Sequence, residues 1–351
     1  MLKFAFLPAL CLAFVAAPSW GQSADPAAAP PAPSAPSAPS TVLADAASDA
    51  APVPEQILVV GQKPGPGMWK VSKDDHVLWI FGTYSPLPVK MDWRSHEVEA
   101  VIKRSQEYLA PPHGKADIGY LQGLMALPLL IGINNNPDDA TLRDVLPADV
   151  YARWLPFKEK YLPKDKERER PIFVANKLFS VAMKQAGLST STDVRKQVEK
   201  LVDDHKLKVT RTVLALPIEN ARRVIKDFKK SPLDDAACFA ATLTRLETDI
   251  EGMRLRANAW SKGDIEAIRK LDFVDQQESC TNVILNSAAM RDNPTFQEAM
   301  PRLRAMWVAN AEAALARNMS TFAVLPIKDV LNPKGMVAAL AAKGYKVEQP
   351  E

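Results

Sequence analysis

The chain of 351 residues has few of the side chains that most often carry catalysis, with only four histidines and three cysteines. His96 and Glu97 open what could be an H-E-x-x-H zinc motif, but Ala100 stands where the second histidine is needed. Ser85 has no G-x-S-x-G elbow around it, and Pro86 after it has no backbone N–H for an oxyanion hole. The sequence therefore lacks the usual signatures of zinc and serine hydrolases.

An excess of charge of one sign is also missing. The chain has 44 lysines and arginines against 41 aspartates and glutamates, for a formal net charge of +3. Even the segment KEKYLPKDKERERP at residues 158–171 interleaves acids with bases, which is typical of a solvated face. A nucleic-acid surface needs net positive charge to release counterions. No nucleic-acid partner is therefore expected.

Long apolar runs are confined to the N-terminus, which has the three parts of a secretory signal peptide. Lys3 precedes an apolar run over residues 4–17, and the small-x-small sequence SWG follows at residues 19–21. The apolar run is too short to span a bilayer as a helix. Cleavage is expected after residue 21, with Ala17 and Ala24 as alternatives. The sequence thus predicts a periplasmic or secreted protein with no transmembrane segment after export.

Proline, in contrast, is abundant, and it recurs in residues 22–56 among alanines and serines, as in APSAPSAPS. Such a composition buries too little apolar surface to offset the entropy of ordering the chain. It predicts a disordered linker, which has either a tethering role or none. Residues 57–351 contain no second linker of this kind and are expected to form one domain.

Patterns at both ends of this domain predict the same strand, loop, helix, strand order. Aromatic and β-branched runs at residues 69–72 and 77–81 indicate a hairpin, and Gly82 allows a tight turn after it. A helix after residue 95 and a strand at 107–110 complete the first unit. The second unit combines a strand at 321–325, a loop at 326–335, a helix at 336–343 and a strand at 344–348.

Between these units the sequence is mostly helical, and one long helix is expected to open with Ser231 as its cap and Pro232 in its first turn. The tryptophans at positions 69, 79, 93, 154, 260 and 307 have the spacing of core residues. The fold class that follows is α/β, or mixed α+β, with a composite sheet around a large helical middle. Its two loops after residues 82 and 326 should meet at one sheet edge.

Cys238 and Cys280 are the cysteines that lie beyond the signal peptide. An even number of cysteines in an oxidising compartment predicts a disulfide, and two buried free thiols are the alternative. Cys238 lies near the start of a predicted helix, so the bond could join two helices. Closing a loop of this length is worth about 4 kcal/mol in the chain-entropy model.

Four segments occur in an order that resembles the TraB/GumN family, relatives of the Tiki metalloproteases. They are MWKV before a strand ending in FGT, ANAWSKGDIEAI at residues 257–268, Asn310 in a late helix, and the final GMVAALAAKGYKVE. The likeness covers nearly all of residues 66–349. It implies a single domain and, in members thought to be active, a divalent metal that activates water. Histidines of two G-x-x-H motifs and nearby carboxylates are its implied ligands.

This chain departs from both motifs. The first reads GTYS at residues 82–85, so Ser85 replaces the histidine, and the second reads PIKD at residues 326–329, so Asp329 takes the ligand position. Three further positions differ, one of them in the late helix, where Ala309-Asn310 stands in place of an Arg-Asn pair of the family. A strand that ends in glutamate in the family is followed by APP at residues 110–112, and Arg211 replaces a carboxylate. Asp193, in contrast, matches the family.

The resemblance therefore implies a vestigial cleft rather than a working metal site. Its expected members are Gly82, Ser85, Asp193, Arg211, Asn310 and Asp329. A catalytic zinc usually has three protein ligands, and a cation at Arg211 would oppose a metal in the same pocket.

The sequence favours a non-catalytic binding or accessory role in the cell envelope, without a cofactor. The partner would be an unknown protein or small molecule. One alternative is a metal-dependent hydrolase or peptidase with the rebuilt ligands Asp193, Asp329 and His113. A purely structural envelope protein is the other.

Overall fold

The computed structural model describes residues 65–89, 91, 93, 95–190, 193–231, 233–270, 276–287, 290–291 and 293–350. The side chains of residues 193 and 276–278 are not part of this description. The predicted signal peptide at residues 1–21 and the predicted linker at residues 22–56 lie outside the described residues. Within these residues the protein combines a mixed sheet with many helices, which confirms the predicted α/β class.

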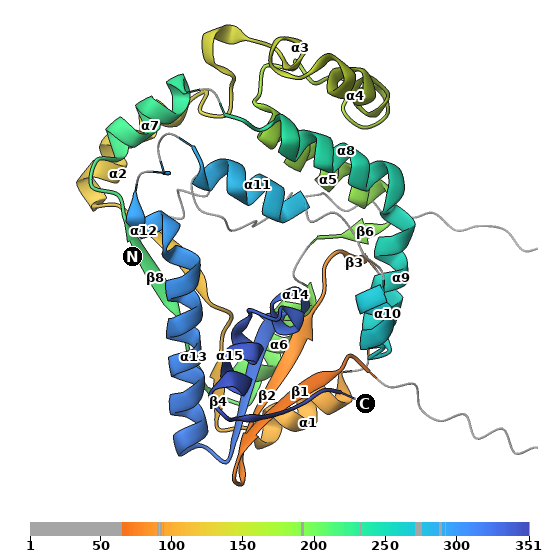
Figure 1. Ribbon diagram of the computed structural model, residues 1–351, viewed down its shortest axis with the longest axis vertical. Coiled ribbons are helices and arrows are strands. Elements are labelled where there is room, and N and C mark those ends of the chain that lie inside the picture. Colours follow the sequence, from red (N-terminus) through yellow and green to blue (C-terminus); the bar gives the residue numbers. More distant parts are fainter. Residues whose placement is uncertain are drawn as a thin grey trace, which may run out of the picture. The chain divides into compact units, whose positions relative to one another are not determined.

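A six-stranded sheet lies in the lower half of the view in Figure 1. Its strands are β1 Met68–Lys73, β2 His76–Thr83, β4 Glu107–Leu109, β7 Lys208–Thr210, β9 Ser320–Pro326 and β10 Lys346–Glu348. Their order across the sheet is β10-β1-β2-β9-β4-β7. Strands β2, β9, β4 and β7 are parallel, whereas β1 is antiparallel to both of its neighbours. The strands from both ends of the domain therefore form one composite sheet, as predicted.

Two small strand pairs lie outside this sheet. Strand β3 Leu87–Pro88 pairs antiparallel with β6 Leu188–Ser189, and β5 His113–Asp117 pairs in parallel with β8 Val213–Pro217. Neither pair is predicted from the sequence. Each joins segments about a hundred residues apart, and such pairing leaves no local pattern in the chain.

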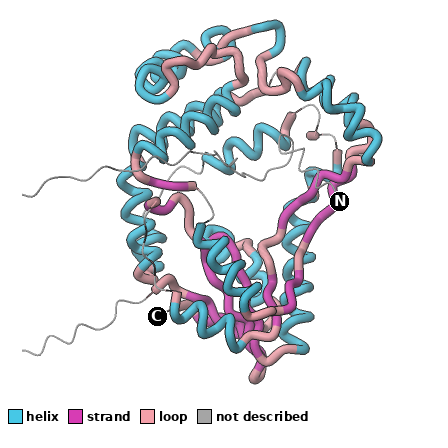
Figure 2. The backbone as a smooth tube through the Cα atoms, turned by 180° about the vertical axis from the view of Figure 1, so that it is seen from behind, coloured by secondary structure: helices cyan, strands magenta, loops and turns pink. Residues whose placement is uncertain are grey.

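Helices make up most of the remaining structure (Figure 2). The helices are α1 His96–Arg104, α2 Tyr120–Ala126, α3 Leu142–Val145, α4 Ala148–Tyr161, α5 Pro171–Gln185, α6 Asp193–Asp204, α7 Ala221–Lys230, α8 Ala236–Thr248, α9 Ile250–Ser261, α10 Ile265–Lys270, α11 Gln276–Leu285, α12 Pro294–Gln297, α13 Ala299–Arg317, α14 Ile327–Leu331 and α15 Met336–Ala342. Short 3₁₀ turns are η1 Leu127–Leu130 and η2 Pro137–Asp139.

Aromatic side chains join the sheet to helix α9. The Phe81 ring, on β2, lies 5.6 Å from the ring of Trp93 and 6.0 Å from that of Trp260 on α9. Phe322 of β9 lies on the same cluster, 6.5 Å from Phe81. All four rings are buried. Because aromatic pairs at this spacing add packing energy to simple burial, they fix α9 next to the end of β2.

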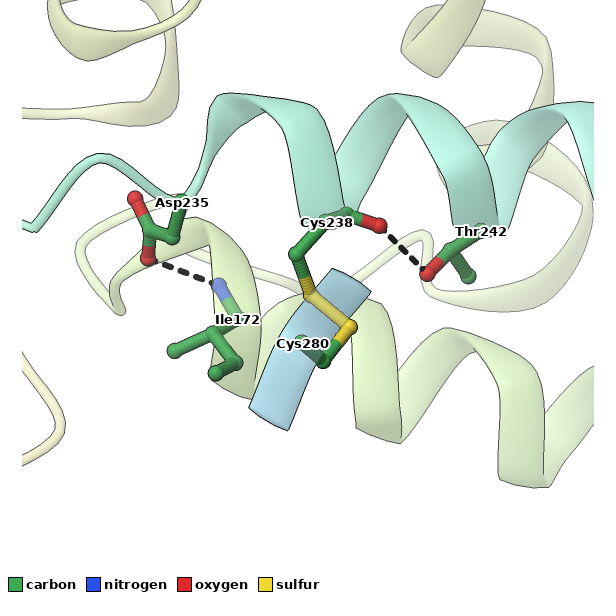
Figure 3. The surroundings of a disulfide bond; sticks show 5 residues. All are labelled: Ile172, Asp235, Cys238, Thr242 and Cys280. Atoms are coloured by element: carbon green, nitrogen blue, oxygen red, sulfur yellow. Dashed lines mark hydrogen bonds between the residues drawn. A yellow bond between two sulfur atoms is a disulfide. The ribbon is translucent and has the colours of Figure 1, made fainter. Parts of the chain in front are cut away.

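A second core lies among the middle helices α4, α5, α8 and α9. Trp154 of α4 meets the edge of Phe239 of α8, with ring centroids 5.5 Å apart. The predicted disulfide is present in this core, where Cys238 of α8 bonds to Cys280 of α11 across a sequence separation of 42 residues (Figure 3). Of the predicted core tryptophans, those at 69, 93, 154, 260 and 307 are buried, and Trp79 is partly buried.

The buried carboxylate Asp235 precedes α8 and lies near the disulfide (Figure 3). Its Oδ2 atom accepts a hydrogen bond of 2.9 Å from the backbone N–H of Ile172. Burial raises the pKa of Asp235 to about 6, although this hydrogen bond and the charge of Arg170 both act to lower it. The carboxylate thus anchors the first turn of α5 next to the disulfide-linked helix.

Two predicted boundaries are wrong. Ser231 closes α7, because its backbone N–H bonds to the carbonyl of Asp227, and the following helix begins only at Ala236. Pro232, which was predicted to lie in the first turn of that helix, is outside the described residues. The expected loop at residues 326–335 contains the short helix α14. Its five residues are too few for a periodic apolar pattern to reveal.

Candidate functional site

The ends of the parallel strands bring the predicted site segments to one edge of the sheet. In the register of β2 and β9, Gly82 lies opposite Leu325 and Thr83 opposite Pro326. The two loops that replace the G-x-x-H motifs therefore lie side by side, as predicted. On the other side of β9, strands β4 and β7 end at Leu109 and Thr210.

Gly82 is enclosed on two sides. Its carbonyl accepts a hydrogen bond of 2.6 Å from the indole Nε1 of Trp260, on α9. A Cβ atom at position 82 would lie 2.8 Å from Cζ3 of Trp69 and 3.3 Å from Cγ1 of Ile327. Glycine is required here because the neighbouring side chains occupy the space that any other residue would need.

Tyr84 continues this contact from the same loop. Its hydroxyl accepts a hydrogen bond of 3.1 Å from Nε of Arg256, which is also on α9 and only 1% exposed. Burial raises the pKa of Tyr84 above its usual value, although the hydrogen bond and charge of Arg256 oppose the rise. The tyrosine is therefore neutral and acts as a hydrogen-bonding anchor for the loop.

A buried ion pair holds Arg256 in turn. Nη2 of Arg256 bonds to Oδ2 of Asp249, which lies 3.6 Å from Nε of Arg245. A Cβ at Gly252 would lie within contact distance of both Asp249 and Arg256, so a small residue there allows the pair to form. The paired charges and hydrogen bonds compensate the cost of burying the guanidinium of Arg256. Sequence reasoning missed Tyr84, Arg245, Asp249 and Arg256, although Trp260 lies inside the ANAWSKGDIEAI segment.

Ser85, the residue at the first histidine position, is exposed. The bond between Ser85 and Pro86 is a cis peptide, and Pro86 is buried. Asp329, at the second position, lies half-buried in α14. Asp193 is the first residue of α6, and its side chain lies outside the described part of the structure.

Arg211 and Asn310 lie at the β7 side of the same sheet edge. Asn310 of α13 donates from Nδ2 to the hydroxyl of Thr212 over 2.8 Å, and Thr212 is buried. The backbone carbonyl of Thr212 accepts from the N–H of His113 over 3.1 Å. The side chains of Arg211 and His113 are both exposed. This half of the site is therefore a hydrogen-bonded junction between α13, β5 and the turn after β7.

A buried carboxylate is present at the start of β4 rather than at its end. Glu107 is 1% exposed and accepts hydrogen bonds from Thr210, Asn318 and Arg317, with Nη2 of Arg317 at 2.7 Å from Oε1. Burial acts to raise the pKa of Glu107, but these hydrogen bonds outweigh it and the pKa is lowered. Each carboxylate oxygen is engaged within the protein, so Glu107 serves the fold rather than a ligand.

The residues at the two motif positions differ from the metal ligands that the family resemblance implies. Among the residues the structure describes, no group of three or more His, Cys, Asp or Glu side chains could hold a metal ion. Ser85 contributes an exposed hydroxyl where an imidazole is implied, and Arg211 a cation where a carboxylate is implied. A rebuilt ligand set of Asp193, Asp329 and His113 remains a hypothesis, because the side chain of Asp193 is not described.

Comparison with known proteins identifies the family. Residues 67–349 match the model of the TraB/PrgY/gumN family, and the chain therefore belongs to this family. No curated protein and no solved structure matched the chain. A search of the described helices found none that is both long and apolar enough to cross a membrane.

Proposed function

We propose that this protein is an exported member of its family that has lost the metal-hydrolase site and acts by binding. Its role would be that of an accessory protein in the cell envelope, with a protein or small molecule as ligand. The observation that carries the proposal is the enclosure of the Gly82 loop. Trp260 and Arg256 hold this loop through Gly82 and Tyr84, and Ser85 is exposed to solvent.

The chemistry of the two replaced positions supports this proposal. A serine hydroxyl is a weak donor to a divalent cation compared with a histidine nitrogen or a carboxylate. That leaves Asp329 as the one carboxylate that the two replaced motifs supply. A single carboxylate does not provide the three protein ligands typical of a catalytic zinc. Without a metal, the sheet edge that carries these two loops would bind its ligand through shape, hydrogen bonds and charge.

Elemental analysis of the purified protein tests the loss of the metal site. We expect well below one equivalent of zinc, manganese, cobalt or iron per chain, with no difference between the wild type and Asp329→Asn. Asp203→Asn is the matched control, since Asp203 is an exposed carboxylate on α6. One tightly held equivalent that is lost in Asp329→Asn and kept in Asp203→Asn would contradict the proposal, above all if peptidase activity is lost with it.

Export is tested separately by the mass of the protein isolated from its native host. We expect a chain that lacks residues 1–21 and is recovered from the periplasm or the medium. A full-length chain recovered from the cytoplasm would contradict this part of the proposal. Deletion of residues 22–56 then shows whether the linker matters, because a tether should change location or interaction when it is removed.

A further inference from the structure

An exposed apolar patch lies on the segment that contains α2 and η1. Residues 118–136 contain no charged side chain and no histidine. Five large apolar side chains in this segment are exposed, from 51% at Leu124 to 79% at Ile131. They are Tyr120, Leu121, Leu124, Met125 and Ile131. An apolar group of this kind on a folded protein usually marks an interaction surface.

The patch is part of a packed structure. Ala126 and Ile133, from the same segment, are buried against Ile225 and Phe228 of α7. Figure 1 shows α2 beside α7, and contacts between the two helices agree with the view. Arg170 holds the C-terminal end of α7, since its guanidinium is 1% exposed and donates to the carbonyls of Phe228 and Ser231. The exposed side chains therefore project from a fixed support.

Helix α7 borders the patch with a row of cations. Arg222, Lys226 and Lys229 are spaced at i, i+4 and i+7, so they share one stripe of the helix. Lys229 identifies which side this stripe faces, because its Nζ donates to the backbone carbonyl of Ile131 over 2.8 Å. The single acid of the helix, Asp227, lies off this stripe and pairs with Arg223 at 3.6 Å.

From this juxtaposition we infer that the α2–η1 patch and the Arg222, Lys226 and Lys229 row form a docking site for an anionic lipid surface. Apolar side chains next to a basic helix face are the combination that binds in the interfacial plane of a membrane. The aliphatic side chains would enter the acyl boundary, the ring of Tyr120 would lie at headgroup level, and the cations would contact lipid phosphates. This docking would be peripheral and does not depend on what the Gly82 loop binds.

Charge favours a lipid surface over a second copy of this chain. In a two-fold dimer through the patch, each copy would present the same surface to the other. A two-fold axis through the patch would set the row of one copy against the opposite edge of the other copy, so the dimer would gain nothing from the row as a whole. An anionic surface instead gains attraction from every cation of the row. Asp117, at the end of β5, and Glu219, just after β8, are exposed acids. Attraction to an anionic surface is therefore expected from the α7 side of the patch only.

Co-sedimentation with phospholipid vesicles tests the inference. Full-length wild type should bind vesicles with about 30% anionic lipid, and should bind less as salt rises or when only zwitterionic lipid is present. Leu121→Glu/Leu124→Glu should weaken binding about tenfold for each leucine, and Arg222→Glu/Lys226→Glu about fivefold for each cation. Because all variants keep the same N-terminus, its apolar segment contributes equally to each.

The matched control is Leu255→Glu/Met300→Glu, which changes two exposed apolar residues outside the patch. This variant should bind like the wild type, and melting curves should show that all variants are folded. Equal vesicle binding by all four proteins would overturn the inference. So would a wild type that ignores vesicles and forms a dimer in light scattering, if Leu121→Glu/Leu124→Glu converts that dimer to monomers.

Discussion

Trp260 donates its indole N–H to the carbonyl of Gly82 over 2.6 Å, and this bond links helix α9 to the end of strand β2. Gly82 is the first residue of the segment GTYS, and the family resemblance implies a metal-binding histidine three residues later, at Ser85. Together with the bond from Arg256 to Tyr84, it makes the loop part of the packed structure. Substitutions that break these contacts should therefore lower the free energy of unfolding.

Trp260→Phe should destabilise the protein by removing this hydrogen bond. The free energy of unfolding should fall by about 1–3 kcal/mol more than it does for the same substitution at a matched tryptophan, because the buried carbonyl of Gly82 loses its donor. Trp307→Phe is the match, since Trp307 is also fully buried and its Nε1 has no partner among the described residues. Urea unfolding of both variants measures the difference. Equal losses would mean that the bond to Gly82 contributes little.

Gly82→Ala should also destabilise the protein, by about 1–3 kcal/mol, because its Cβ would overlap a packed core. The nearest atom would be Cζ3 of Trp69 at 2.8 Å. Gly123→Ala in α2 provides the control, since its Cβ would meet only Ile118 at 3.8 Å. That variant should be neutral or more stable by up to about 1 kcal/mol, as alanine is the better helix former. If Gly82→Ala leaves the free energy of unfolding unchanged, the loop has room for a side chain.

Asp235 should make stability depend on pH below neutrality. Its pKa is about 6 in the folded protein, above the ordinary 3.8, so the folded state holds the proton more tightly than the unfolded state. The contribution of Asp235 to the free energy of unfolding should therefore be greatest below about pH 4 and fall by about 3 kcal/mol in all as pH rises through 6. Urea unfolding at pH 4.5 and 7 measures the fall.

Asp235→Asn should remove this part of the pH dependence, because asparagine keeps an acceptor for Ile172 and has no proton to lose. Asp234→Asn, at the exposed neighbouring position, should leave it in place. If wild type and Asp235→Asn show the same change between the two pH values, the buried carboxylate is not its source.

Loss of the disulfide should cost about 4 kcal/mol, because the unfolded chain is freed from a loop across a separation of 42 residues. Cys238→Ala and the double variant Cys238→Ala/Cys280→Ala should lose similar amounts, since the bond is absent in both. Mass analysis without reductant should find Cys238 linked to Cys280 in the protein isolated from its native host. Two thiols that react with an alkylating agent would contradict the bond.

The sequence was sufficient for the parts of the fold that depend on local patterns. The hairpin of β1 and β2 follows from two apolar runs around a turn, and Asp74 at its tip has a φ of 55°. The meeting of the loops after Gly82 and Leu325 follows from parallel strands whose ends share one edge. The pairing of Cys238 with Cys280 follows from their even number in a chain that is predicted to be exported.

Long-range polar contacts could not be predicted in the same way. The bond from Arg256 to Tyr84 spans 172 residues, and nothing around either residue indicates the other. The carboxylate of Glu107 likewise finds Arg317 from 210 residues away. Sequence reasoning identified Ser85, Arg211 and Asp329 as departures from a family pattern, but the contacts that replace the pattern are set by tertiary packing.

Thermal unfolding during a titration with divalent metal tests the central claim that the Gly82 edge is not a metal site. A ligand that binds only the folded state at one hundred times its Kd stabilises by about 2.7 kcal/mol, which is a readily measured rise in Tm. We predict no saturable rise with zinc, manganese or cobalt, and no fall when a chelator is added to the purified protein. A rise that saturates at one equivalent and disappears in Asp329→Asn would contradict the claim.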